Sequence, residues 1–60
     1  MDEKFKKRSE QLIALGLVDN GRSYVYDVGV ISVRVNYPDV LSFSEEKWSK
    51  SITDIKMAIK

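Results

Sequence analysis

The chain contains neither cysteine nor histidine among its 60 residues, so no disulfide and no typical zinc site can hold its fold together. Domains of this length bury only about 60% of the surface that their unfolded chains expose, and many depend on disulfides, metals or partner chains. Because the first two devices are excluded, we expect no metal and no cofactor. The sequence favours association with a partner chain.

The same absence removes most catalytic chemistry. Without histidine there is no Ser-His-Asp triad, and without cysteine there is no thiolate nucleophile. Glu45 and Glu46 are adjacent, so on a helix they point about 100° apart and cannot flank one bond as an acid–base pair. The three glycines are too scattered for a phosphate-binding loop. We therefore predict no catalytic residues and a protein that is not an enzyme.

Charge and hydropathy exclude further classes of function. Ten basic and nine acidic side chains leave a net charge of +1, whereas nucleic-acid-binding domains are usually more basic. The longest apolar run, Leu12–Val18, is far shorter than the ~20 residues that span a bilayer. Met1-Asp2-Glu3-Lys4 lacks the apolar segment of a signal peptide. We expect a cytoplasmic accessory protein of a bacterium or a phage-infected cell, with no membrane contact.

The first segment predicts a helix over residues 3–15, with Asp2 as its cap. One side of this helix collects most of its apolar residues at helical spacing. This side comprises Phe5, Ser9, Leu12, Ile13 and Gly16. Gly16 stands where a left-handed helix C-cap is expected, with Leu17 folded back on the last turn. Asp19-Asn20-Gly21 then indicates a turn.

Residues 22–27 and 30–36 predict a β-hairpin, because they are rich in aromatic and β-branched residues that alternate with polar ones. With Asp27-Val28-Gly29 as the turn, Tyr26 is expected opposite Ile31, and Tyr24 opposite Val33. One face then carries Tyr24, Tyr26, Ile31, Val33 and Val35, and the other carries Val25, Asp27, Val30, Ser32 and Arg34. A slip of one residue would instead place the tyrosines beside Ser32 and Arg34.

The last segment predicts a helix over residues 45–59. Ser44 is its expected cap, and Phe43 and Trp48 have the spacing of a hydrophobic staple. Its apolar stripe consists of Trp48, Ile52, Ile55 and Ile59. Pro38 ends the preceding sheet. We expect Trp48 to lie buried against the hairpin, with the stripes of both helices around it.

These elements predict one α+β domain over residues 1–60, of order α-β-β-α, with two helices packed on one face of a β-hairpin. The hairpin's second face and both of its edges remain uncovered, and unpaired edges are templates for another strand. We therefore expect a small non-enzymatic protein-interaction module that binds a second copy of itself or another protein. The candidate interface, at a hairpin edge or on its mixed face, comprises Val25, Val30, Arg34, Tyr24 and Tyr26.

A nucleic-acid-binding regulator that uses the hairpin and the basic first helix is the alternative. Its candidate contacts are Lys4, Lys7, Arg8, Arg22 and Arg34. The basic run also carries acidic residues at i, i+4 spacing, which is typical of a solvated helix face. The two tyrosines are likewise more typical of a core or a dimer interface than of a base-stacking platform.

Overall fold

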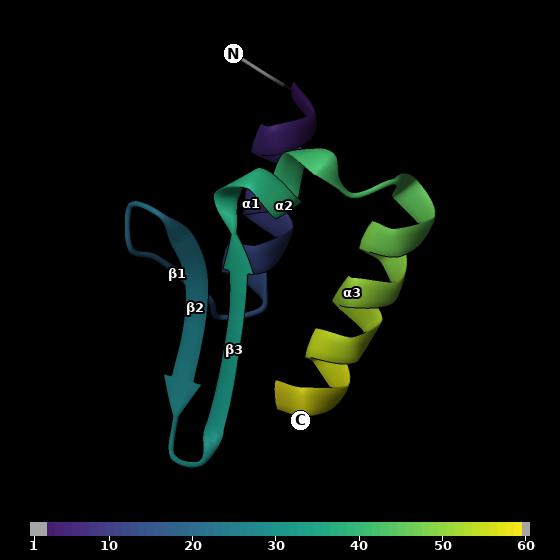
Figure 1. Cartoon of the computed structure of the whole chain (residues 1–60). Coiled ribbons are helices and arrows are strands. Elements are labelled where there is room, and N and C mark those ends of the chain that lie inside the picture. The colour runs from purple at the N-terminus through teal and green to yellow at the C-terminus, as the bar shows by residue number, and fades with distance from the viewer. Residues whose placement is uncertain (1–2, 60) are drawn as a thin grey trace.

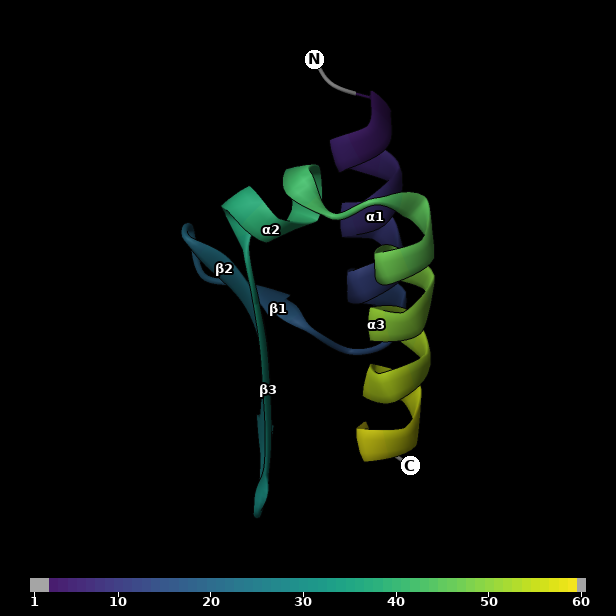
Figure 2. The same ribbon diagram turned by 45° about the vertical axis from the view of Figure 1, so that its right-hand side comes forward.

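The computed structural model describes residues 3–59. Two helices lie on one face of an antiparallel sheet, which confirms the predicted α+β class (Figures 1 and 2). Two short elements, β1 and α2, were not predicted. In chain order the elements are α1 (Glu3–Ala14), β1 (Val18–Asp19), β2 (Ser23–Val28), β3 (Ile31–Asn36), α2 (Tyr37–Ser42) and α3 (Glu45–Ile59).

α1 ends in the glycine cap that the sequence predicts. Gly16 has a φ of 104°, which costs a glycine little because it has no Cβ. The Leu17 N–H donates to the Leu12 carbonyl at 3.1 Å, and the Gly16 N–H donates to that of Ile13 at 3.0 Å. These two bonds form a Schellman motif, and they turn Leu17 back into the core. The predicted cap at the other end, Asp2, lies outside the described residues.

A tight turn after Val18 and Asp19 creates the third strand. The Asn20 side-chain oxygen accepts hydrogen bonds from the backbone N–H groups of Arg22 and Ser23. The chain therefore reverses within a few residues, and β1 pairs antiparallel with β2, giving the sheet order β1-β2-β3. The expectation of two uncovered hairpin edges was wrong for this side, because β1 covers part of it. A two-residue strand has no periodic pattern to reveal it.

The hairpin register differs from the predicted one by two residues. Tyr26 pairs with Val33 and Tyr24 with Val35. The cause is Gly29, whose φ of 60° makes it the first residue of a two-residue turn, so that Val28 belongs to β2 and not to the turn. A shift of two residues keeps every side chain on its face. The predicted separation of faces is therefore correct, although the predicted partners were wrong.

α2 carries the chain from the sheet to α3 and contacts both α1 and β3 (Figure 2). Asn36 is its N-cap residue, and Pro38 lies in its first turn, where a missing N–H costs nothing. Pro38 therefore begins a helix as well as ending the sheet. With six residues, α2 is too short for its periodicity to be recognised. It places Val40 in the core with no exposed surface.

The core lies between the sheet and the two long helices. Trp48 is 5% exposed, which confirms its predicted burial. Ile13 was expected in the core and is 55% exposed, because α1 turns Leu12 inward and the next residue lies about 100° around the helix. α3 has the predicted bounds, and the Lys47 N–H donates to Ser44 Oγ at 3.2 Å as a cap. The buried apolar residues are Leu12, Leu17, Tyr24, Val35, Val40, Trp48, Ile52 and Ile55.

Candidate binding groove at the open edge of the sheet

The five residues of the predicted interface do not share one surface. Tyr24 is 3% exposed, and its hydroxyl donates to Ser9 Oγ of α1 at 2.8 Å. Tyr26 is half-buried on the same face of the sheet. Val25 and Arg34 are cross-strand partners on the opposite face, and Val30 is fully exposed at the hairpin tip. The structure therefore brings together Val25 and Arg34 and separates them from the tyrosines.

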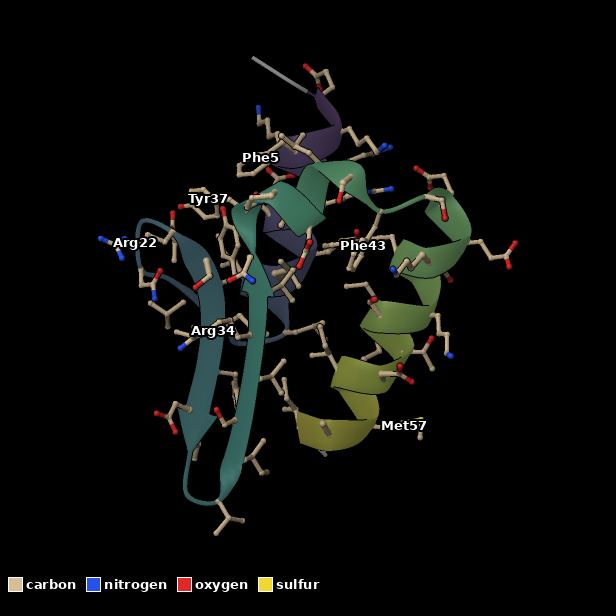
Figure 3. All side chains as sticks on the ribbon, viewed as in Figure 1. Phe5, Arg22, Arg34, Tyr37, Phe43 and Met57 are labelled. Carbon is tan, nitrogen blue, oxygen red and sulfur yellow. The ribbon has the colours of Figure 1, made fainter. Side chains whose placement is uncertain are left out.

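The predicted nucleic-acid contacts are also divided between two parts of the molecule. Arg8 is 3% exposed and points into the protein. Lys4 and Lys7 border a depression between α1 and α3 whose lining carries both signs of charge. Arg22 and Arg34 point away from both long helices (Figure 3). The structure therefore gives these five residues no common basic surface.

Arg8 was predicted to contact nucleic acid at the surface, but in the structure it holds elements of the fold together. Its guanidinium donates to the backbone carbonyls of Val40 and Phe43, each at 2.8 Å. A third bond, at 3.1 Å, goes to the exposed carboxylate of Glu45. Three donors of one fork-shaped group thus fasten α2, the link after it and the start of α3 to α1.

The alternation of hydrogen bonds along the β2–β3 ladder shows which backbone groups of β3 point out of the sheet. The Tyr37 N–H donates to the Arg22 carbonyl at 3.1 Å, and hydrogen-bonded pairs alternate along an antiparallel ladder. The backbone groups of Val33 and Val35 therefore point toward β2. Those of Ser32 and Arg34 point the other way, out of the sheet. β2 is protected on its outer side by β1, with Val25 opposite Val18.

α3 lies on the same face of the sheet as α1, but close to the open edge of β3 and not above the middle of the sheet (Figures 1 and 2). Figures 1 and 2 together show α1 over β1 and β2, with α3 displaced to the far side of β3. The contacts agree, because α1 touches β1 and β2 whereas α3 touches β3. α3 therefore overhangs the position that a fourth strand would occupy.

A groove of about 270 Å³ lies between the β3 edge and α3. We call it the β3–α3 groove. The apolar part of its lining includes Val35 and Ile55, which are buried, and Phe43, which is half-buried. Two carboxylates, those of Asp39 and Asp54, also line it. The full lining is Val33, Arg34, Val35, Asp39, Phe43, Ser51, Asp54 and Ile55.

A separate polar contact fastens β1 to the start of α2. The Tyr37 hydroxyl donates a short hydrogen bond to the Asp19 carboxylate. This bond lowers the pKa of Asp19 and raises the pKa of Tyr37 to about 12, because it favours the charged carboxylate and the neutral phenol together. The Phe5 ring meets that of Tyr37 edge-on at 5.5 Å. The pair stabilises the end of the sheet that is remote from the hairpin tip.

No protein-family model, curated protein or solved structure matches this chain. Across residues 3–59, no three acidic side chains are placed to hold a metal ion together. None of the helices in that range is both long and apolar enough to cross a membrane. The candidate site is the β3–α3 groove, which lies beside the outward-facing backbone groups of β3.

Proposed function

We propose that this protein is a non-enzymatic protein-interaction module that binds its partner by adding a strand to the open edge of β3. The most direct support is that the backbone N–H and C=O groups of Ser32 and Arg34 point out of the sheet. This direction follows from the alternation of hydrogen-bonded pairs between β2 and β3. Unpaired edge groups beside a groove are the arrangement used in β-strand addition. The main chain then supplies part of the affinity, and the groove supplies the rest together with selectivity.

The magnitudes are consistent with a reversible contact. Two outward-facing residues offer two donors and two acceptors, and each hydrogen bond contributes about 0.5–1.5 kcal/mol net. That gives roughly 2–6 kcal/mol, whereas a micromolar complex requires about 8 kcal/mol. The remainder must come from apolar contact in the β3–α3 groove, where Phe43 is only half-buried in the free protein. We expect a partner of micromolar affinity.

A proline placed at an outward-facing position tests this function. Ser32→Pro removes one outward N–H and no hydrogen bond to β2, and proline is tolerated on edge strands. Ser32→Thr keeps the N–H and is the matched control. A partner isolated from the native cell and then purified should bind the wild type and Ser32→Thr equally, and Ser32→Pro at least about tenfold more weakly.

Two results would contradict the proposed function. One is a purified partner that binds Ser32→Pro as tightly as it binds the wild type, when thermal unfolding shows that the variant is folded. The other is tight binding of duplex DNA that weakens steeply with salt and depends on Lys4, Lys7 or Arg22. That result would favour the nucleic-acid-binding alternative.

A further inference from the structure

Resting on the proposed function, we infer that the β3–α3 groove takes an extended segment of a different protein, with aliphatic and basic side chains on the face turned toward α3. The aliphatic side chains would contact Ile55 and Phe43. A lysine or arginine would pair with Asp54 or Asp39. Three features support this occupant: the free edge of β3, the helix that overhangs it and the charges of the groove.

The free edge of β3 suits one added strand. A strand added to a sheet lies about 4.7–4.9 Å from its neighbour and alternates its side chains between the two faces. On the edge of β3, every second side chain of the added strand would point up at α3, into the lining formed by Ser51, Asp54 and Ile55. The intervening side chains would point to the opposite face, beside Arg34. The groove should therefore recognise every second residue of the bound segment.

The overhang of α3 disfavours a second copy as the occupant. An antiparallel pair of β3 strands would place the α3 helix of each copy over the β3 strand of the other. The two strands would lie about 4.8 Å apart, whereas packed helices need about 8–10 Å between their axes. The two helices would therefore crowd each other. A segment that brings no helix of its own avoids this conflict.

The charges of the groove require a cation that β3 of a second copy does not carry. Within residues 3–59, neither Asp39 nor Asp54 takes part in an ion pair. The Arg34 side chain points away from α3 (Figure 3). Lys47 lies over the Phe43 ring, with its Nζ 4.6 Å from the centroid. The β3 residues that face the helices are Ile31, Val33 and Val35, so a second copy would leave both carboxylates unpaired.

The experiment uses a phage-displayed library of random short peptides selected against the immobilised full chain. Enriched peptides are synthesised, and their affinity is measured by fluorescence anisotropy for the wild type, Asp54→Lys and Ser32→Pro. Glu46→Lys, which makes the same charge change on α3 outside the groove, is the matched control. An N-methylated form of each peptide blocks its backbone hydrogen bonds without altering the protein.

We expect the enriched peptides to carry aliphatic and basic residues at every second position, so that these side chains lie on one face of the bound strand. Asp54→Lys should weaken them about tenfold, and exchanging the peptide's basic residue for glutamate should restore binding to that variant. Glu46→Lys should change the affinity less than about threefold, and N-methylation should abolish binding.

The remaining outcomes separate this inference from the proposed function. Peptides that lose affinity on N-methylation but show no basic residue and no response to Asp54→Lys would overturn the partner's chemistry and leave strand addition intact. Peptides that bind equally well when N-methylated, and bind Ser32→Pro as they bind the wild type, would overturn both. A library that yields no binder overturns the inference. If the wild type is then a dimer and the Ser32→Pro variant is a monomer, the occupant of the edge is a second copy of the chain.

Discussion

The guanidinium of Arg8 stacks over the indole of Trp48, with its Cζ atom 4.8 Å from the ring centroid. The indole also contacts α1 through a hydrogen bond, in which the Trp48 Nε1–H donates to Gln11 Oε1 at 2.7 Å. Together with the Arg8–Glu45 ion pair, these contacts join α1 to α3 in addition to the apolar packing. In a domain without disulfides, such contacts carry a large share of a small net stability.

Arg8→Ala should destabilise the fold by about 2–4 kcal/mol, because it leaves the carbonyls of Val40 and Phe43 without their donors. The ion pair with Glu45 contributes little to this loss, since that carboxylate is exposed. Urea unfolding measures the effect. Lys7→Ala, on the exposed side of the same helix, should change stability by less than about 0.5 kcal/mol. Equal effects of the two substitutions would show that the Arg8 contacts are not stabilising.

Trp48→Ala should cost about 3–5 kcal/mol and unfold most of the protein at 37 °C. Trp48→Phe should cost less, about 1–2 kcal/mol, because it keeps much of the ring while losing the bond to Gln11. Thermal unfolding followed by circular dichroism distinguishes the two variants. Cooperative unfolding of Trp48→Ala within ~1 kcal/mol of the wild type would contradict the burial of the indole.

The predicted features that proved correct are those with local causes. Ser44 and the isoleucine spacing define α3, Gly16 defines the end of α1, and the alternation of residue types defines the faces of the hairpin. The register failed because it depends on whether Val28 belongs to the strand or to the turn. β1 and α2 were missed because each is too short for a periodic pattern.

The candidate site was harder to predict than the fold, because it depends on packing between distant segments. Arg34 is the residue that the predicted interface and the β3–α3 groove share. Tyr24 was assigned to the interface, but it is buried and its hydroxyl donates to Ser9, fifteen residues away. The displacement of α3 beyond β3 follows from how α2 crosses the end of the sheet. No spacing within β3 or α3 encodes that crossing.

A pair of glycine substitutions isolates one packing contact. An alanine Cβ at Gly16 would lie 3.3 Å from Cε2 of Tyr26, whereas at Gly21 it would meet no atom within 4 Å. Both glycines have positive φ, so each alanine carries a backbone cost of roughly 1–2 kcal/mol. Gly16→Ala should be more destabilising than Gly21→Ala by about 1 kcal/mol, as measured by urea unfolding. A reversed order would show that the Tyr26 ring moves aside freely.

The Asp19–Tyr37 hydrogen bond predicts losses of stability at both extremes of pH. The pKa of Asp19 is lowered from 3.8 in the folded state, so its contribution is present above pH 3.8 and is lost as the pH falls through the folded-state value. The pKa of Tyr37 is raised from 10.0 to about 12, so its contribution is present below pH 10.0 and is lost between there and about pH 12.

Tyr37→Phe should remove the loss at high pH and weaken the loss at low pH, because the Gly21 N–H still donates to the Asp19 carboxylate. In this variant the pKa of Asp19, followed by NMR titration of its carboxyl carbon, should return toward 3.8. Tyr37 itself is followed in the wild type by its ultraviolet absorbance change on ionisation. An Asp19 titration that is identical in the wild type and in Tyr37→Phe would show that the hydrogen bond does not form in solution.

The two-residue strand β1 limits how far association through the sheet can extend. β1 occupies the edge of β2 at Tyr24 and Val25, and the uncovered stretch beyond it begins at Asp27, whose charge opposes pairing. Across residues 3–59, extended pairing is therefore available on the β3 side. Under the proposed function, a chain that accepts a strand at β3 and offers no comparable edge on β2 would not pass the contact on from copy to copy, so strand addition would end at a complex of fixed stoichiometry and would not grow into a fibre.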